Sequence, residues 1–312
     1  MRILAITCFL ASALMAQIGP SPQGPVQYTR PPDFSNIRYG TPERDVLDLW
    51  KAPSDHPTML VVYFHPGGFN HGDKSWIERF DKPMLDLCLS RGISVATVNY
   101  RYVGPDNVHM PEPLYDAARS IQFLRLHAKE YNINPKAVIP TGGSAGGVMG
   151  LWIAFHDDLA DPKSDDPVKR QSTRVCTTGV VDAQSTLDPR VLVKVVDPKW
   201  ASHPVIRALY GVAADAPDVA KAYPLFEASS AINFLTKDDP PVFAYYTHNL
   251  SPNPPKDTNE MVHNPRLGVV LKEQMDKLGI ECIFRTPKDY PGQKNRPFTS
   301  DMVDFFEKHC GK

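Results

Sequence analysis

An α/β fold with a mostly parallel central sheet, covered by helices on both faces, is the architecture that this sequence predicts. Short apolar runs typical of buried strands alternate along the chain with segments whose apolar residues recur at helical spacing. One strand-like run leads into the glycine-rich turn of residues 141–147, and an apolar helix-like run at residues 148–155 follows it. Because strands that alternate with helices form parallel sheets with helices on both faces, these observations predict the fold class.

The individual elements follow from the same patterns. Strands are expected at residues 36–39, 46–51, 59–64, 93–99, 137–139, 175–181, 241–246 and 282–285, the first two of them as edge strands. Helices are expected at residues 83–91, 113–131, 148–155, 267–278 and 301–309. Residues 187–235 contain helical fragments and prolines but no convincing strand, so we expect them to form a cap over the carboxyl edge of the sheet.

The N-terminal end has the form of a secretory signal peptide. Residues 1–16 carry one positive charge, a short apolar core and small residues at the end, with cleavage expected after Ala13 or Ala16. Residues 17–34 are rich in proline, glycine and serine, and we interpret them as a flexible leader. We expect one α/β domain over residues 35–312, secreted or periplasmic and without a stable membrane anchor, because no later apolar run reaches transmembrane length.

The composition argues against several kinds of partner. The chain has 34 basic and 35 acidic side chains, a formal net charge of −1 and no basic stripe, so neither nucleic acid nor an anionic membrane surface is an expected partner. Aspartates between residues 157 and 166 fit no calcium loop, and no metal site or cofactor is predicted. The cysteines after the signal show no C-x-x-C spacing. Cys88 and Cys176 are expected to be buried thiols, whereas Cys282 and Cys310 are candidates for a disulfide.

The glycine-rich turn contains the pattern Gly142-x-Ser144-x-Gly146, which is that of a nucleophile elbow. In an elbow the strand folds back sharply into a helix, and side chains two residues either side of the nucleophile would collide. The helix N-terminus places the N–H of Ala145 where an oxyanion would form. The pattern therefore predicts Ser144 as a nucleophile, although a glycine-rich turn without chemistry has the same composition.

A second glycine motif lies upstream, at the end of the strand expected at residues 59–64. The sequence His65-Pro-Gly-Gly-Phe69 has the composition of a loop whose main-chain N–H groups form the other half of an oxyanion hole. Taken alone, this motif is also compatible with a plain β-turn. Because both motifs follow strands in the required order, we expect Gly67 or Gly68 to bind an oxyanion together with Ala145.

With these motifs the chain resembles the α/β-hydrolase superfamily, in particular its carboxylesterase and hormone-sensitive-lipase-like branch. The resemblance is carried by residues 65–69, Val98-Asn-Tyr-Arg-Tyr102, Pro113-Leu-Tyr-Asp116 and residues 142–147. It implies an α/β-hydrolase fold with a cap insertion and Ser144 as the nucleophile. It also implies that the N–H groups of Gly67 or Gly68 and of Ala145 are the oxyanion donors.

The partners of the serine depart from the pattern of this superfamily. An acid is expected soon after residue 246 and a histidine soon after residue 285, and the sequence has neither there. A transposed pair is one interpretation, with His263 as the base and Asp289 as the acid that orients it. Asp257 and Glu260 are alternative orienting carboxylates. A missing or impaired base is the other interpretation, and both stay open.

The remaining histidines after Ser144 are weaker candidates for the base. His156 follows the elbow helix and is expected to be structural, His203 lies in the cap, and His309 lies in the terminal helix. His248 ends a strand at the catalytic edge, where it is expected to bind a loop.

The sequence is therefore compatible with two functions, an enzyme and a binding protein. The first is a secreted serine hydrolase that cleaves carboxylic esters through an acyl-enzyme on Ser144. The alternative is a catalytically impaired binding protein that keeps the pocket but lacks a competent histidine and acid. No residue indicates a transferase or a peptidase. The expected partner is a small-molecule or carbohydrate-linked ester, whose acyl and alcohol groups the cap selects, and the oligomeric state is left open. Aromatic residues of the cap that suit such groups are Trp200, Tyr210, Tyr223 and Phe226.

Overall fold

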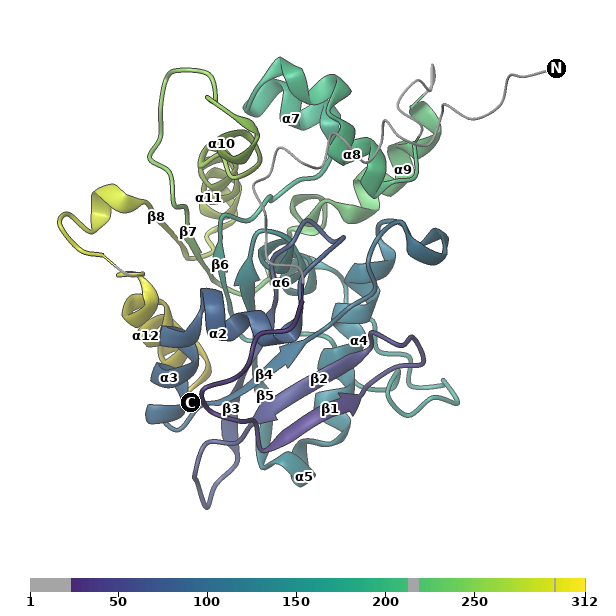
Figure 1. The fold of residues 1–312 in the computed structure, drawn as a ribbon, viewed down its shortest axis with the longest axis vertical. Helices are drawn as coiled ribbons and strands as arrows, with labels where there is room; N and C mark the ends of the chain where they lie inside the picture. The colour runs from purple at the N-terminus through teal and green to yellow at the C-terminus, as the bar shows by residue number, and fades with distance from the viewer. Residues whose placement is uncertain (1–23, 213–218, 295, 312) are drawn as a thin grey trace.

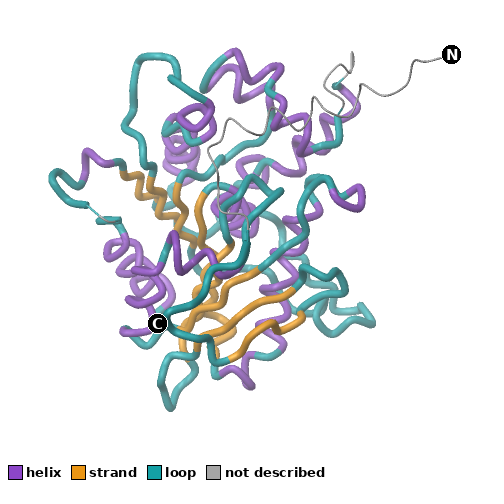
Figure 2. Tube along the Cα trace, viewed as in Figure 1, coloured by secondary structure: helices purple, strands orange, loops and turns teal. Residues whose placement is uncertain are grey.

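A computed structural model describes residues 24–212, 219–294 and 296–311, so the signal-like segment and residues 17–23 lie outside the described residues. Eight strands form one sheet in the order β1-β2-β4-β3-β5-β6-β7-β8 (Figure 1; Figure 2). The β1–β2 and β2–β4 pairs are antiparallel, and all pairs from β4 to β8 along the sheet are parallel. The mostly parallel sheet agrees with the sequence prediction. Of the two strands expected at the edge, the first is an edge strand, whereas the second pairs on both sides.

The strands lie close to their predicted positions. They are β1 (Phe34–Arg38), β2 (Val46–Trp50), β3 (Thr58–Phe64), β4 (Ser94–Val98), β5 (Ile133–Gly143), β6 (Thr178–Val181), β7 (Val242–Tyr245) and β8 (Cys282–Arg285). Every residue of β4 and all but one of β3 are buried, as expected for central strands that carry helices on both faces.

Helices cover both faces of the sheet. On one face, α4 (Glu112–Leu126), α6 (Ala145–Phe155) and α11 (Arg266–Leu278) pack on alternate strand residues such as Val62. On the other face, α3 (Lys82–Ser90) and α12 (Thr299–Cys310) pack on residues such as Val61. Side chains alternate across a strand, so these neighbours belong to two separate cores. The sheet thus holds the carboxyl ends of its strands between two rigid layers.

Short helices complete the described chain. The α-helices are α2 (Ile77–Phe80), α5 (Ala128–Tyr131), α7 (Pro189–Val195), α8 (Pro204–Leu209), α9 (Tyr223–Ser229) and α10 (Thr258–Val262). The 3-10 helices are η2 (Lys74–Trp76), η3 (Pro105–Asn107), η4 (Pro198–Ser202), η5 (Ala220–Ala222), η6 (Ala231–Phe234) and η7 (Pro287–Asp289). The single helix predicted at residues 113–131 is divided into α4 and α5.

The segment between β6 and β7 contains the residues predicted to form the cap. Its helices α7, α8 and α9 gather at one end of the molecule, at the top of Figure 1. Hydrogen bonds join this segment to α6 and α11: Trp152 Nε1 donates to the carbonyl of Ala228, and an Arg266 guanidinium N–H donates to the carbonyl of Val196. No helix within the described ranges combines the length and apolarity needed to cross a membrane.

The described part of the predicted leader is bound to the domain rather than free. Trp76 Nε1 donates to the carbonyl of Gly24 at 3.0 Å, and the N–H of Val26 donates to the Ser75 hydroxyl at 2.7 Å. The Tyr28 hydroxyl donates to Asp48 at 2.7 Å. Residues 24–33 are poor in apolar side chains, but these polar contacts hold the segment on the domain.

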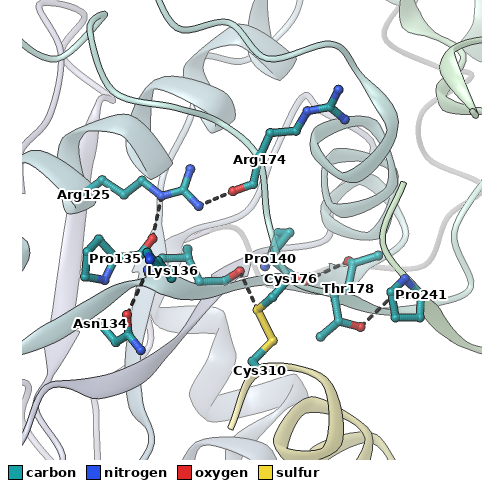
Figure 3. The surroundings of a disulfide bond; sticks show 12 residues. Arg125, Asn134, Pro135, Lys136, Pro140, Arg174, Cys176, Thr178, Pro241 and Cys310 are labelled. Atoms are coloured by element: carbon teal, nitrogen blue, oxygen red, sulfur yellow. Dashed lines mark hydrogen bonds between the residues drawn. A yellow bond between two sulfur atoms is a disulfide. The ribbon is translucent and has the colours of Figure 1, made fainter. Parts of the chain in front are cut away.

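The disulfide differs from the expected one. Cys310 pairs with Cys176 across a sequence separation of 134 (Figure 3). Cys282 is a buried free thiol. The prediction of Cys176 as a thiol and of Cys282 as a partner for Cys310 was therefore wrong. The reason is the layer structure: Cys282 belongs to the core beneath α11, whereas Cys310 ends α12 on the opposite face of the sheet.

Candidate active site

The nucleophile elbow predicted at residues 142–146 is present at the end of β5. The strand ends at Gly143, Ser144 follows with φ 51° and ψ −118°, and α6 begins at Ala145. A positive φ is costly for a residue with a side chain and recurs at functional sites. The N–H of Ser144 donates to the carbonyl of Val181 at the end of β6, at 2.8 Å. The turn therefore presents the Ser144 side chain at the carboxyl edge of the sheet.

The glycines of the elbow are required by close backbone contacts. A Cβ atom at Gly142 or at Gly146 would overlap the carbonyl oxygen of Phe64, the last residue of β3. A Cβ atom at Gly143 would instead lie 3.8 Å from its nearest neighbour, which is ordinary contact. The elbow thus packs directly against the end of β3, from which the second glycine motif leaves.

The loop after β3 carries the predicted oxyanion donors beside the elbow. Gly67 and Gly68 have φ values of 129° and 57°, a region that favours glycine. The Gly67 carbonyl accepts hydrogen bonds from the N–H groups of Asn70 and His71. Within the described ranges, the N–H groups of Gly67 and Gly68 donate no backbone hydrogen bond. Both remain available to a ligand.

Buried aromatic residues hold this loop in place. The ring of Tyr100 stacks on that of His65 with centroids 4.3 Å apart, and the Tyr100 hydroxyl donates to the His65 carbonyl at 2.8 Å. Burial lowers the pKa of His65 to about 3, so its ring is neutral at physiological pH. The N–H of Val103 donates to the carbonyl of Phe69 at 2.8 Å. His65 is therefore a structural support of the loop.

An ion pair joins the Val98–Tyr102 and Pro113–Asp116 motifs, which both contributed to the superfamily resemblance. Arg101 donates from Nε and from an η nitrogen to the two carboxylate oxygens of Asp116, at 2.8 Å and 2.7 Å. This bidentate pair joins the segment containing Tyr100 to α4. The Val98–Tyr102 and Pro113–Asp116 motifs therefore position the loop of Gly67 and Gly68.

His263 lies at the serine. Its Nε2 atom is 2.9 Å from Ser144 Oγ, although the two residues are 119 positions apart in the chain. His263 directly follows α10, in the long connection between β7 and α11. Both side chains are partly exposed, so a substrate can reach them. A nucleophile and a base at this distance have the geometry required for general-base activation.

Asp289 is not the partner of His263 that the sequence predicts: within the described residues, the ring nitrogen Nδ1 contacts Asn259 and not Asp289. Its carboxylate accepts the N–H of Thr286 at 2.7 Å and closes a capping box at η7. The η7 helix follows β8 directly, and the residue caps that helix, because an aspartate three positions after a threonine satisfies free backbone donors there.

The alternative carboxylates are also engaged in local capping. Asp257 accepts the N–H of Glu260 at 2.8 Å at the start of α10. Glu260 in turn accepts the N–H of Lys256 at 2.7 Å. Both stabilise α10, the helix that ends at His263.

The other histidines have structural contacts. His156 packs against Trp152 and Phe234, His203 caps α8, and His309 pairs with Glu281. His248 lies 3.3 Å from the Thr247 hydroxyl. Of the histidines after Ser144, the structure therefore places His263 in contact with the nucleophile.

Two residues near His263 were missed by the sequence analysis. Asn259 Oδ1 is 2.9 Å from His263 Nδ1, on the side of the ring away from Ser144. Asp182 follows β6 directly and is buried, with φ 52°. The i, i+4 spacing of Asn259 and His263 was a usable signal, whereas Asp182 is brought near only by the fold.

Opposing influences act on the His263 imidazole. Burial lowers its pKa below the usual value, the charge of Asp182 raises it, and His248 lowers it further. The lowering prevails, so the ring is neutral at physiological pH and its Nε2 lone pair is free to accept a proton.

The chain is similar in sequence to curated ester hydrolases. The probable carboxylic ester hydrolase LipM of Mycobacterium tuberculosis is 26% identical over 230 residues, which are 72% of this chain and 49% of that protein. The esterase LipQ of the same organism is 25% identical over 219 residues, 68% of this chain and 48% of that protein. The chain thus spans about half the length of these curated relatives.

Solved structures share the fold. A truncated carbohydrate esterase from gut microbiota matches with a TM-score of 0.67 and 18% identity, over 93% of this chain and all of that one. An acetyl ester-xyloside bifunctional hydrolase from Caldicellulosiruptor lactoaceticus matches with a TM-score of 0.61 and 22% identity, over 90% and 94% of the two chains. The predicted α/β-hydrolase fold is confirmed.

The BD-FAE family model matches residues 47–261. The match contains the glycine loop of residues 65–69 and Ser144, and it stops just before His263. Because the match covers more than half of the chain, this protein belongs to the BD-FAE family, within the α/β hydrolases.

Proposed function

We propose that the protein is a serine hydrolase that cleaves carboxylic esters, with Ser144 as the nucleophile and His263 as its base. The observation that carries the proposal is the 2.9 Å separation of His263 Nε2 and Ser144 Oγ at a nucleophile elbow. The similarity to curated esterases supports the same reaction class.

The reaction uses groups from both glycine motifs. Ser144 Oγ attacks the ester carbonyl carbon while His263 Nε2 takes the hydroxyl proton. The N–H groups of Ala145 and of Gly67 or Gly68 stabilise the oxyanion, and His263 returns the proton to the departing alcohol. Water then attacks the acyl-enzyme, again through His263, and releases the carboxylic acid and free Ser144.

The substrate class we propose is a small-molecule or carbohydrate-linked ester. A structure neighbour described as a carbohydrate esterase and one described as an acetyl ester-xyloside hydrolase favour a short acyl group on a sugar. Of the aromatic residues predicted to suit such a substrate, Tyr223 is partly exposed in the segment between β6 and β7, whereas Trp200, Tyr210 and Phe226 are buried in the core.

We also propose that the protein is exported. The form of residues 1–16 motivates this, and the Cys176–Cys310 disulfide fits an oxidising compartment. Mass spectrometry of the exported chain should find a new N-terminus near Leu14 or Gln17; an intact Met1 on protein retained inside the cell would contradict export.

The test of the hydrolase is a paired measurement on Ser144→Ala. Hydrolysis of p-nitrophenyl acetate and labelling by a fluorophosphonate probe should both be lost in this variant. Ser90→Ala is the matched control, because Ser90 is an exposed serine on α3, on the opposite face of the sheet from α6. Unchanged turnover in Ser144→Ala would reject the proposal.

The competing hypothesis is a binding protein without a competent base. The contact between His263 and Ser144 argues against it. If the wild-type protein neither hydrolyses esters nor reacts with the probe, the binding-protein hypothesis replaces the hydrolase.

A further inference from the structure

The nitrogen of His263 that faces away from Ser144 is held by an amide and not by a carboxylate. Asn259 Oδ1 lies 2.9 Å from Nδ1, and one helical turn brings the two side chains together. An amide oxygen accepts a hydrogen bond, so it keeps the proton on Nδ1 and leaves the Nε2 lone pair toward Ser144. Asn259 therefore selects the tautomer that a base needs, but it brings no charge to stabilise an imidazolium.

A buried carboxylate, that of Asp182, directly follows β6, the strand next to β5 in the sheet. Asp182 follows Val181, the residue whose carbonyl accepts the N–H of Ser144. The Asp182 side chain is held at both oxygens by Thr247, from its N–H at 2.8 Å and from its hydroxyl at 2.7 Å. Asp182 is thus fixed at the carboxyl edge of the sheet, beside the elbow.

The Gln184 side chain joins the main chain of Asp182 to that of Val262, the residue before His263. Gln184 Nε2 donates to the carbonyl of Asp182 at 3.0 Å and to the carbonyl of Val262 at 2.6 Å. Val262 directly precedes His263, so the turn after β6 and the end of α10 are held together. The charged and titratable groups that act on His263 are Asp182 from the turn after β6 and His248 from the loop after β7.

We propose that Asn259 and Asp182 divide between them the task of the triad acid. Asn259 orients the neutral ring of His263, and the Asp182 carboxylate stabilises the positive charge that the ring gains when Ser144 gives up its proton. This rests on the proposed esterase function. Nucleophile, acid and base then occur in the chain order Ser144, Asp182, His263, which is the order usual for this fold. The superfamily pattern places the acid after β7 and the histidine after β8. Here Asp182 follows β6 and His263 follows β7, so each lies one strand earlier.

The first test changes the amide. In Asn259→Leu the ring loses its orienting acceptor, and kcat should fall about 10- to 100-fold with KM nearly unchanged. In Asn259→Asp an oxygen acceptor is kept and a negative charge is added beside the ring, so kcat should fall less than in Asn259→Leu. The acid limb of kcat/KM against pH should move to higher pH in this variant, because a nearby anion raises the pKa of a histidine.

The second test removes the charge of Asp182. Asp182→Asn should lower kcat about 100-fold, less than the roughly 10⁴-fold known where the acid bonds the histidine directly. Its acid limb should move to lower pH, opposite to Asn259→Asp. Thr247→Val is the matched control, because it removes one hydrogen bond of Asp182 and keeps the charge; its pH profile should match that of the wild type.

The combined variant separates charge from structure. Asp182→Asn with Asn259→Asp restores a carboxylate beside His263, so kcat should rise at least 10-fold above that of Asp182→Asn alone if the divided task is correct. A purely structural Asp182 predicts no rescue, and that result would overturn the proposal. Wild-type turnover and pH profile in both Asn259→Leu and Asp182→Asn would also overturn it, provided that Ser144→Ala is inactive. An active Ser144→Ala would instead reject the esterase itself.

Discussion

The two sides of the candidate site are built in different ways. The nucleophile side, made of the elbow at residues 142–146 and the loop at residues 65–69, consists of backbone turns at the ends of buried strands. The base side, residues 247–263, is a long connection in which His263 directly follows the five-residue helix α10. Every residue of α6 behind the elbow is buried, whereas Asn259 on α10 is exposed.

The difference shows which parts of such a site tolerate relocation. The nucleophile side depends on the main chain, because its N–H groups and the strained turn at Ser144 must occupy fixed positions. On the base side a single imidazole has to reach Ser144 Oγ, and any loop at the same edge of the sheet can supply it. Here the imidazole beside Ser144 belongs to the connection after β7, whereas the superfamily pattern expects a histidine in the loop after β8.

Removal of the imidazole is the largest effect that we expect and tests whether the base side depends on one side chain. His263→Ala should lower kcat about 10²- to 10⁴-fold, the usual contribution of a general base. His248→Ala is the matched control, because His248 lies on the same connection and contacts Thr247 instead of Ser144. Its kcat should stay within a few-fold of the wild type. Equal losses in both variants would contradict the assignment of the base.

Loss of the disulfide tests whether the nucleophile side depends on a remote link. Cys176→Ala with Cys310→Ala should lower the free energy of unfolding by about 2–5 kcal/mol, because a long loop is no longer closed in the unfolded chain. The bond joins Cys176, just before the start of β6, to Cys310 at the end of α12 (Figure 3). Ser144 follows the opposite, carboxyl end of the neighbouring parallel strand β5. The kcat of the folded variant should therefore be unchanged.

Thermal unfolding with and without reductant measures this effect. Reductant should lower the Tm of the wild type and leave that of the double variant unchanged. A Tm that does not respond to reductant in the wild type would show that the bond does not form.

A methyl group in the elbow tests how closely the nucleophile side is packed. Gly146→Ala places a Cβ against the Phe64 carbonyl, which is backbone and cannot rotate away. Overpacking of this kind should destabilise the fold by about 1–3 kcal/mol, measured by denaturant unfolding. Gly143→Ala, in the same motif, meets only an ordinary contact and should unfold near the wild-type midpoint. Similar destabilisation by both would mean that the contact with β3 does not limit the elbow.

The pH dependence is the smallest expected effect and concerns the environment of the base. Neutral imidazole is the active form, and burial lowers the pKa of His263, so kcat/KM should rise with pH and reach half its plateau below pH 6.5. His248 lowers this pKa further, so His248→Ala should move the midpoint upward. A wild-type midpoint above pH 6.5 would contradict the burial of the ring.

Much of the nucleophile side is predictable from sequence because its requirements are local. Gly142 and Gly146 are needed by the turn that contains Ser144, and Gly67 and Gly68 adopt conformations that favour glycine. The strand runs around them are buried on both faces and are therefore continuously apolar. Local composition thus predicts the sheet, the elbow and the loop.

The base side was only half predictable. His263 was identified because few histidines follow Ser144 and it lies in an unusual excursion. Asp289 was chosen from its loop, but its spacing from Thr286 makes it a helix cap. The pairing of Cys310 failed for a similar reason, since the chain pattern does not say which face of the sheet each cysteine occupies.

The sequence by itself determined which segments form strands and helices along the chain, the elbow of Ser144 and the glycine loop. Each of these depends on residues that are close together in the chain. Only the tertiary structure decided that Asp182 lies near His263, that Asn259 contacts its ring and that Cys176 pairs with Cys310. These contacts join segments that are distant in sequence, except Asn259, and they depend on which strand ends lie side by side in the sheet. The position of each strand in the sheet is set by the packing of the whole domain, and no local sequence pattern predicts it.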